Sequence, residues 1–319
     1  MPTAPQIDCP QGSLFSLFGG DSEDENDVDN QTDCNFDQHY EVQKVDLAGE
    51  ELLVRQYVFH SHNANRVWPG TFNLAEYIIG DEAKEGNLVA KMRRGASVLE
   101  LGAATGLLAI RLAAAGVLAV TTSDVDDGHV DDGHGKSDDT VIENIEYNFY
   151  LNGFGRDDSI GTKRASLSTE QMEFRMKKKT AMVKKRTLLT DQSAAEANAS
   201  DQFIPTPPHI PHTWGTGWTE SMCCANQTVQ IYDYIIASDI LLYVTSYPAL
   251  VKTLTELMKP SFGNKFNCVD DIQGNKIPKF IMSWNRRMKE SAEFFKMMET
   301  AGFESVHEGK CVYTFSIRK

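Results

Sequence analysis

Apolar and polar positions follow two different periods along the chain, and these periods predict its first elements. Over residues 40–59 they alternate in two runs, which is the pattern of a hairpin or of edge strands. Over residues 71–80 the apolar side chains fall near helical spacing, and Gly80 is suited to end that helix. We therefore expect order to begin near Tyr40, with paired strands followed by a helix.

The most informative segment is ASVLELGAATGLLAIRLAAAGVLAVTTSD, residues 96–124. A short apolar strand at Val98–Leu101 leads into a glycine-rich turn, a helix at Leu107–Ala115 and a second apolar strand at Leu118–Thr122. Neither strand alternates with polar residues, as expected for parallel strands that are covered on both faces. The segment therefore predicts a β-α-β unit.

The same rhythm returns further along the chain. We therefore predict a doubly wound α/β sheet with helices on both faces. Its ligand should lie at the carboxyl ends of the strands. The later strands are expected at residues 232–243, 279–284 and 311–318, and the later helices at 247–259 and 290–303.

Two stretches interrupt this rhythm and are interpreted as insertions, near residues 125–139 and 153–212. A third strand should be hidden in the second insertion, either at residues 163–169 or at residues 184–190. The lysine clusters there, in RMKKKTAMVKKR, favour a solvated basic loop over a nuclear-localisation signal.

The first insertion contains VDDGH twice in succession, which raises the question of a metal site. A calcium loop fails on spacing, because glycine falls where the third ligand should be and no glutamate closes the loop. A zinc site would need His129 and His134 on one rigid face, which a glycine-spaced loop does not supply. We expect no metal here, and instead a surface insert that begins directly after Asp124.

Composition narrows the class of protein. The chain has 319 residues, a size that suits one elaborated domain, and residues 1–39 are expected to be a disordered acidic tail. A net charge of −14 argues against nucleic acid as a partner. We see neither a signal peptide nor a membrane-spanning run, and the six cysteines form no CxxC pair. We expect a monomer in the cytoplasm, with the nucleus as a second location.

The glycine turn after the first core strand could cradle a dinucleotide, a phosphate or a nucleoside without phosphate. The dinucleotide pattern requires glycine where Ala104 stands, and a P-loop requires a Gly-Lys-Ser/Thr that is absent. What remains is Glu100 followed by Gly102 and Gly106. A carboxylate in this place repels phosphate but suits S-adenosylmethionine, which carries a positive sulfonium and no phosphate.

Asp124 stands at the end of the second strand, where the ribose of a nucleoside would reach. A carboxylate can accept hydrogen bonds from both ribose hydroxyls at once. The competing interpretation is that Asp124 only caps the next helix or starts a turn.

Five segments in this order resemble one known family: RVWPGTFNLAEYI, VLELGAATGLLAI, ENIEYNFYLNG, HTWG and YDYIIASDILLY. They are similar to the family-16 group of seven-strand, S-adenosylmethionine-dependent methyltransferases, which includes protein-lysine methyltransferases and proteins labelled nicotinamide-N-methyltransferase-like. The resemblance implies a methyltransferase domain over residues 40–319, with a mostly parallel Rossmann-like sheet and an antiparallel closing strand. It implies these cofactor-binding residues: Trp68, Glu100, Gly102, Ala103, Gly106, Asp124, Trp214 beside the adenine, and Ser238.

Relatives carry an Asp-x-x-Tyr pattern after the fourth strand, facing the nucleophile, whereas this chain has one more residue between Asp239 and Tyr243. The resemblance therefore makes Asp239 the candidate for orienting the acceptor amine and Tyr243 a candidate pocket wall. Asp239 could instead be a buried carboxylate bonded to loop amides. Asn144 and Asn148 match a recurrent asparagine-rich helix and are interpreted as structural.

The expected activity is methyl transfer from S-adenosylmethionine to a lysine of a protein substrate. An alternative acceptor is a small molecule or a protein histidine, because one fold accommodates each by changing its loops. An alternative of another class is a protein that binds the cofactor and interacts with partners without transferring methyl groups.

Overall fold

The computed structural model describes most of the chain after its first 39 residues. Contacts along the chain divide it into Met1–Asp37 and Gln38–Lys319, and only the second unit contains described residues. The expected acidic tail and the VDDGH repeat beyond Val125 lie outside the described part, so both interpretations stay predictions. The described residues are 40–57, 63–80, 87–125, 140–155, 167–189, 203–224, 231–259, 277–285 and 289–318.

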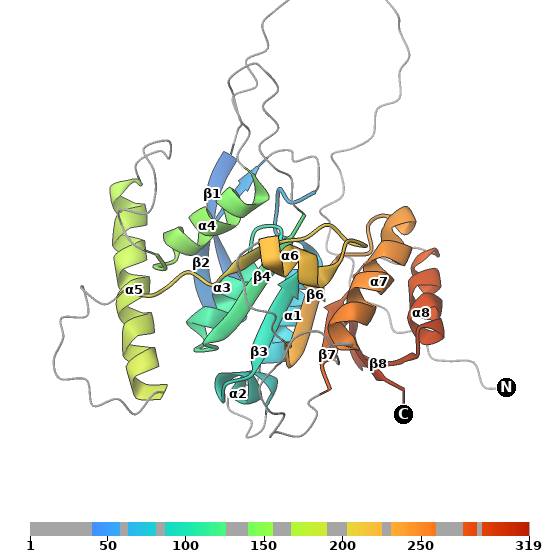
Figure 1. Ribbon diagram of the computed structural model, residues 1–319. Helices are drawn as coiled ribbons and strands as arrows, with labels where there is room; N and C mark the ends of the chain where they lie inside the picture. Colours follow the sequence, from blue (N-terminus) through green and yellow to red (C-terminus); the bar gives the residue numbers. More distant parts are fainter. Residues whose placement is uncertain are drawn as a thin grey trace, which may run out of the picture. The chain divides into compact units, whose positions relative to one another are not determined.

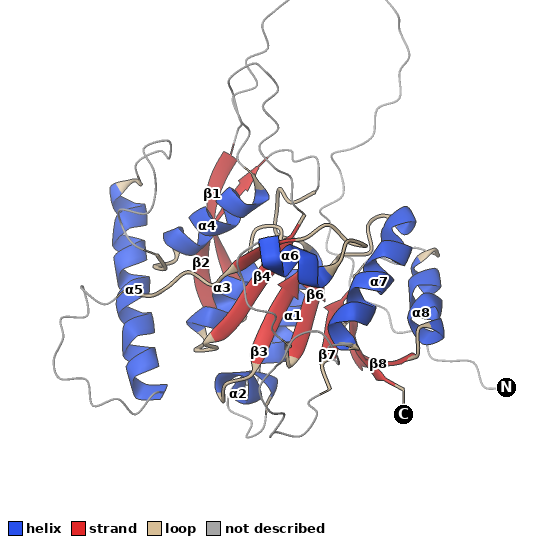
Figure 2. Ribbon diagram, in the orientation of Figure 1, coloured by secondary structure: helices blue, strands red, loops and turns tan. Residues whose placement is uncertain are grey.

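The main sheet consists of β3 (Ser97–Leu101), β4 (Ala119–Asp124), β5 (His209–Pro211), β6 (Tyr234–Ser238), β7 (Lys279–Ser283), β8 (Phe303–Gly309) and β9 (Val312–Ile317). These strands lie in the order β5-β4-β3-β6-β7-β9-β8. Neighbours from β5 to β7 pair in parallel, and Figure 2 shows β4, β3, β6 and β7 side by side. The strand β9 is antiparallel to both β7 and β8. This arrangement confirms the predicted mostly parallel sheet with an antiparallel closing strand.

Helices cover both faces of the sheet (Figure 1). They are α1 (Pro69–Ile79), α2 (Leu88–Arg93), α3 (Leu107–Ala114), α4 (Val141–Leu151), α5 (Thr169–Leu189), α6 (Trp218–Cys224), α7 (Tyr247–Met258) and α8 (Ser291–Thr300), with a 3-10 turn at Val244–Ser246. Because successive strand residues point to opposite faces, the core divides in two. Val98 and Ile236 pack in the cluster that includes α1, α2 and α3, whereas Leu99 and Ile235 pack with α6, α7 and α8. None of the helices among the described residues is long and apolar enough to cross a membrane.

The predicted hairpin is confirmed as β1 (Tyr40–Leu47) and β2 (Glu50–Tyr57), which pair antiparallel. A row of asparagines on α4 fastens it to the domain. Asn148 Oδ1 accepts a hydrogen bond from the backbone N–H of Arg55 at 2.7 Å, and Asn152 Oδ1 accepts one from Leu53 N–H at 3.0 Å. Asn144 Oδ1 accepts from Arg55 Nε at 2.9 Å. The structural interpretation of Asn144 and Asn148 is therefore confirmed.

The predicted positions of the third strand were wrong. It is β5, three residues at the edge of the sheet, and it pairs with β4. Residues 184–189 lie in α5 instead, and among residues 163–169 the described ones form a loop and the start of α5. So short a strand leaves no apolar run in the sequence. Prolines surround it, and proline is tolerated at a sheet edge.

The basic stretch of the second insertion is a helix, α5, and not the solvated loop that its lysines suggested. Its side chains at 175, 179, 182 and 183 are buried, at helical spacing. Arg175 is fully buried, and its guanidinium donates to the backbone carbonyls of Tyr150 at 2.6 Å and Phe154 at 3.0 Å. These contacts attach α5 to the last turn of α4 and to the segment that follows it.

Two features of the later strands also differ from expectation, namely the end of β6 and the presence of β8. The strand expected over residues 232–243 ends at Ser238, because Asp239 adopts a left-handed conformation with φ of 51°. The edge strand β8 was not predicted, since its exposed, largely polar sequence FESVHEG carries no apolar alternation.

Candidate active site

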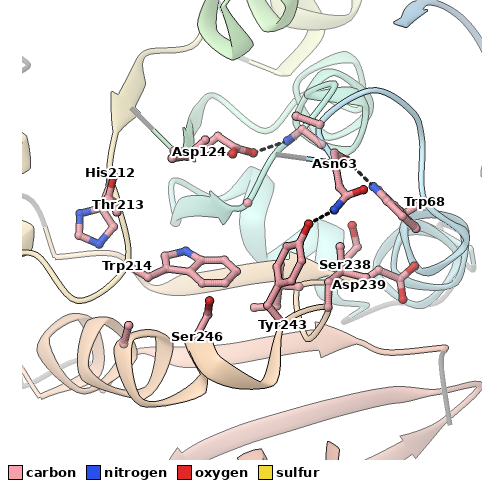
Figure 3. Close-up of a pocket in the computed structure, with 17 residues that line it drawn as sticks. Asn63, Trp68, Asp124, His212, Thr213, Trp214, Ser238, Asp239, Tyr243 and Ser246 are labelled. Carbon is pink, nitrogen blue, oxygen red and sulfur yellow. Dashed lines mark hydrogen bonds between the residues drawn. The ribbon is translucent and has the colours of Figure 1, made fainter. Parts of the chain in front are cut away.

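A cleft of about 320 Å³ opens at the carboxyl ends of β3, β4 and β6 (Figure 3). Its walls come from the segment before α1, from the turns that follow these three strands, and from the segment after β5. This is the position expected for a ligand in an open, mostly parallel sheet.

The glycine turn forms the floor of the cleft. Gly102 has a φ of 69°, and a Cβ atom there would lie 2.9 Å from the side chain of Ile240. Gly106 has a φ of 71° and caps the N-terminus of α3. Ala104 stands where dinucleotide sites carry their middle glycine, yet it also adopts a left-handed conformation, with a φ of 50°. The turn therefore keeps its tight geometry without that glycine, at a cost of about 1–2 kcal/mol.

Asp124 closes the turn from the neighbouring strand. Its Oδ2 accepts a hydrogen bond from Ala104 N–H at 2.6 Å, and its Oδ1 accepts one from Val125 N–H at 2.7 Å. Figure 3 shows its carboxylate at the upper wall of the cleft. A carboxylate at this wall is of the type that can accept hydrogen bonds from ligand hydroxyls.

Glu100 lies beneath the turn rather than on the main wall. It is 2% exposed, and its Oε2 accepts from the backbone N–H of Ala109 at 2.9 Å. Burial raises the pKa of this carboxyl to about 8, with the nearby negative charge of Asp124 acting in the same direction. Ala103 is likewise buried, and its N–H donates to the carbonyl of Ser123 at 3.0 Å. Neither residue is among those that line the main cleft.

Trp214 lines the cleft and belongs to the segment after β5. The segment is held from behind by His212, whose Nδ1 lies 2.8 Å from Ser221 Oγ and whose Nε2 lies 3.1 Å from Thr253 Oγ1. Thr253 Oγ1 also accepts from the N–H of Gly215 at 3.0 Å. Burial lowers the pKa of His212 to about 4, so its ring is neutral at physiological pH.

Trp68 lines the cleft from the segment before α1 and is 8% exposed. Its indole Nε1 donates to the backbone carbonyl of Asn63 at 3.0 Å. The guanidinium of Arg66 lies 4.5 Å from the centre of the indole ring. The tryptophan is thus fixed on both sides.

Asp239 is 2% exposed and reaches the first turn of α1. Its Oδ2 accepts from Gly70 N–H at 2.5 Å, and its Oδ1 accepts from Asn285 N–H at 3.2 Å. In Figure 3 the carboxylate points away from Trp214. Ser238, directly before it, lines the cleft, and its Oγ lies 3.0 Å from Thr71 Oγ1. These contacts match the alternative interpretation of Asp239, a buried carboxylate that is bonded to backbone amides.

Tyr243 stands at the mouth of the cleft with 48% of its surface exposed. Its hydroxyl accepts a hydrogen bond from the side-chain Nδ2 of Asn63. This bond joins two walls of the cleft that lie 180 residues apart in the sequence.

Comparison with family models decides what kind of protein this is. A model described as lysine methyltransferase matches residues 46–151 and 210–301, more than half of the chain. The chain belongs to this lysine methyltransferase family. It is an S-adenosylmethionine-dependent methyltransferase, as the five sequence segments predicted.

Curated proteins give no significant match to the methyltransferase. Among solved structures, the chain is similar to the ribosomal protein L11 methylase of Lactobacillus delbrueckii subsp. bulgaricus (12% identity, 74% of this chain and 80% of that one, TM-score 0.28). The CcbJ methyltransferase of Streptomyces caelestis is also 12% identical, over 72% of this chain and 87% of that one, with a TM-score of 0.33.

The charge of the cleft fits a cationic cofactor without phosphate. Two carboxylates, Asp124 and Asp239, lie among the described lining residues, and no lysine or arginine does. A phosphate would therefore meet no compensating charge here, whereas a sulfonium would meet negative ones. Among the described residues, no group of three potential metal-ligating side chains occurs.

Most residues expected at the site are brought together by the fold. Trp68, Gly102, Asp124, Trp214, Ser238, Asp239 and Tyr243 line the cleft, whereas Glu100, Ala103 and Gly106 support it from below. Sequence reasoning missed Asn63 and the pair of His212 and Thr253. Asn63 contacts Tyr243, which lies 180 residues further along the chain, and no local motif marks Asn63. His212 could have been suspected, because it belongs to the HTWG segment.

Proposed function

We propose that this methyltransferase transfers a methyl group to the side-chain nitrogen of a lysine in a protein substrate. The observation that carries the proposal is a cleft lined by two carboxylates and by no cationic side chain among its described residues, which opens beside the half-exposed Tyr243. Such a cleft attracts an amine, and a large substrate can reach a mouth that lies at the surface. The family description supports the same acceptor.

We propose these roles in holding the cofactor. Asp124 accepts hydrogen bonds from the ribose hydroxyls, and the indole ring of Trp214 packs against the adenine. Trp68 forms the wall on the side of α1. The backbone of Gly102, Ala103 and Gly106 gives the close approach that the cofactor needs, and Ser238 contributes a hydroxyl. Glu100 fixes the turn from below through Ala109 and so acts on the site indirectly.

The main role of these side chains in the reaction is to position the cofactor and the acceptor nitrogen. When bound, S-adenosylmethionine supplies an electrophilic methyl group for an in-line displacement. The acceptor nitrogen must be neutral, although the pKa of a lysine in water is about 10.4. We propose that the apolar surfaces of Trp68 and Tyr243 shield the bound amine from water, which favours its neutral form. Asp239 lines the cleft from the turn after β6, and we propose that its carboxylate orients the amine.

Charge also guides the choice of partner. The chain carries a net charge of −14, which favours association with a basic protein surface and disfavours nucleic acid. We propose that the methyltransferase acts as a monomer in the cytoplasm, with the nucleus as a second location.

The proposal is tested by calorimetry followed by labelling. S-adenosylhomocysteine should bind the purified chain, and no binding at millimolar concentration would contradict the cofactor assignment. Tritiated S-adenosylmethionine is then incubated with the enzyme and a lysate of the source organism. Label in a protein band is the expected result. Label in small molecules alone indicates a metabolite acceptor, and binding without label indicates a protein that holds the cofactor without transferring its methyl group.

A further inference from the structure

The hydrogen bond between Asn63 and Tyr243 crosses the mouth of the cleft (Figure 3). Asn63 belongs to the segment before α1, and Tyr243 belongs to the turn after β6. Both residues line the same cleft as Asp124 and Trp214. A single side-chain contact therefore connects the two walls between which an acceptor would enter.

Asn63 is held in place independently of this contact. Its backbone carbonyl accepts from the Trp68 indole at 3.0 Å, and its backbone adopts a left-handed conformation with φ of 56°. Two residues later, the carbonyl of Asn65 accepts from Tyr57 N–H at 2.8 Å. The backbone thus anchors the segment, and the side-chain amide is left to hold Tyr243.

Within the described part of the chain, no comparable anchor holds the ring of Tyr243. It is 48% exposed and precedes the 3-10 turn at Val244–Ser246. Among the described residues, the bond from Asn63 is the hydrogen bond that its hydroxyl makes. A half-exposed phenol without this bond would sample other rotamers, and ordering it again on substrate binding would cost entropy.

We propose that Asn63 is a positioning residue that acts through Tyr243 and so determines how the acceptor amine is held. The inference rests on the proposed function. A phenol oxygen has two lone pairs, and the amide of Asn63 occupies one of them. The other accepts an N–H of the acceptor amine, which leaves the nitrogen lone pair directed into the cleft.

The test compares Asn63→Ala, Tyr243→Phe and the double variant in two assays. The first assay follows tritium transfer into lysate proteins, and the second measures S-adenosylhomocysteine affinity by calorimetry. We expect each single variant to transfer methyl groups about 10-fold more slowly, because a tenfold change corresponds to the loss of one hydrogen bond. The double variant should be no slower than the singles, and cofactor affinity should change by less than about threefold.

Asn87→Ala serves as the matched control. Asn87 caps α2 by accepting from Ala90 N–H at 2.8 Å, and it does not line the cleft. Its loss should lower stability while leaving the transfer rate unchanged, which separates a general folding effect from a positioning effect.

The outcomes distinguish the inference from the proposed function. Wild type that labels no protein overturns the proposed function and the inference with it. Label in wild type and equal label in Asn63→Ala overturns the inference alone. If the losses of transfer rate in the two single variants multiply in the double variant, the two residues act separately. A large loss of cofactor affinity in Asn63→Ala shows that this side chain holds the cofactor instead. Either result also overturns the inference.

Discussion

The carboxylate of Asp239 accepts a hydrogen bond from the backbone N–H of Gly70 at 2.5 Å. Gly70 lies in the first turn of α1, where a helix leaves its N–H groups unpaired and where its dipole favours a negative charge. The bond therefore fixes the turn after β6 against the segment that carries Trp68. Two walls of the active site keep their spacing because of this contact.

Gly70→Ala should break that relationship. A Cβ atom at this position would lie 2.8 Å from Cγ and Oδ2 of the buried Asp239, and neither group can move freely. We expect a loss of about 1–3 kcal/mol in the free energy of unfolding, together with weaker methyl transfer. Urea denaturation measures the first effect. Gly217→Ala is the control, because the nearest atoms to its Cβ lie 3.7 Å away; equal stability of the two variants would contradict the prediction.

Asp124→Asn should weaken cofactor binding. The neutral amide keeps one acceptor oxygen but loses the charge and the second acceptor, and hydrogen bonds to charged groups are worth about 1.5–3 kcal/mol. The dissociation constant of S-adenosylhomocysteine should rise about 10- to 100-fold by calorimetry. Asp46→Asn, near the end of β1, should leave the dissociation constant unchanged. Unaltered affinity in Asp124→Asn would remove this residue from the cofactor site.

Asp124 and Asp239 differ in how far the sequence could predict their contacts. The turn at Gly102 and the carboxylate of Asp124 follow consecutive parallel strands, whose carboxyl ends must meet at one edge of the sheet. The link from Asp239 to Gly70 was not predictable in the same way, because it depends on how α1 packs on β6. The edge strand at His209–Pro211 was missed because three residues with a terminal proline carry no periodic signal. Local pattern thus predicted the core and the cofactor turn, whereas contacts between distant loops required the structure.

Glu100 should make stability depend on pH. Its pKa rises from 4.5 to about 8 on folding, mainly because burial disfavours the charged form. Between these values the folded chain holds a proton that the unfolded chain has lost, so the stabilisation is complete below pH 4.5 and is lost as pH rises through 8. Glu100→Gln does not titrate. Its stability relative to wild type should therefore grow with pH, by at most about 1.4 kcal/mol per unit.

The measurement is urea denaturation of the cofactor-free proteins at pH 5, 6.5 and 8. Glu173→Gln, at an exposed position of α5, should follow wild type at all three. A constant difference between Glu100→Gln and wild type across this range would show that the carboxyl is not perturbed.

Asn148→Ala should destabilise the domain without altering the cleft directly. The asparagine is fully buried, accepts from Arg55 N–H at 2.7 Å and donates to the carbonyl of Thr105 at 3.0 Å. Truncation leaves both partners without this contact, which costs about 2–6 kcal/mol for two groups. Chemical denaturation should show this loss, whereas Gln43→Ala on the exposed face of β1 should change stability by less than about 0.5 kcal/mol. Similar values for the two would contradict the structural role of the asparagine row.

Lysine as the acceptor is tested most directly by the chemistry of the labelled residue. Proteins labelled by the wild-type enzyme with tritiated S-adenosylmethionine are hydrolysed to amino acids, which are separated against methylated standards. The account predicts that the tritium elutes with methyllysine. Tritium that elutes with methylhistidine, or that appears in no amino acid of the hydrolysate, would contradict it.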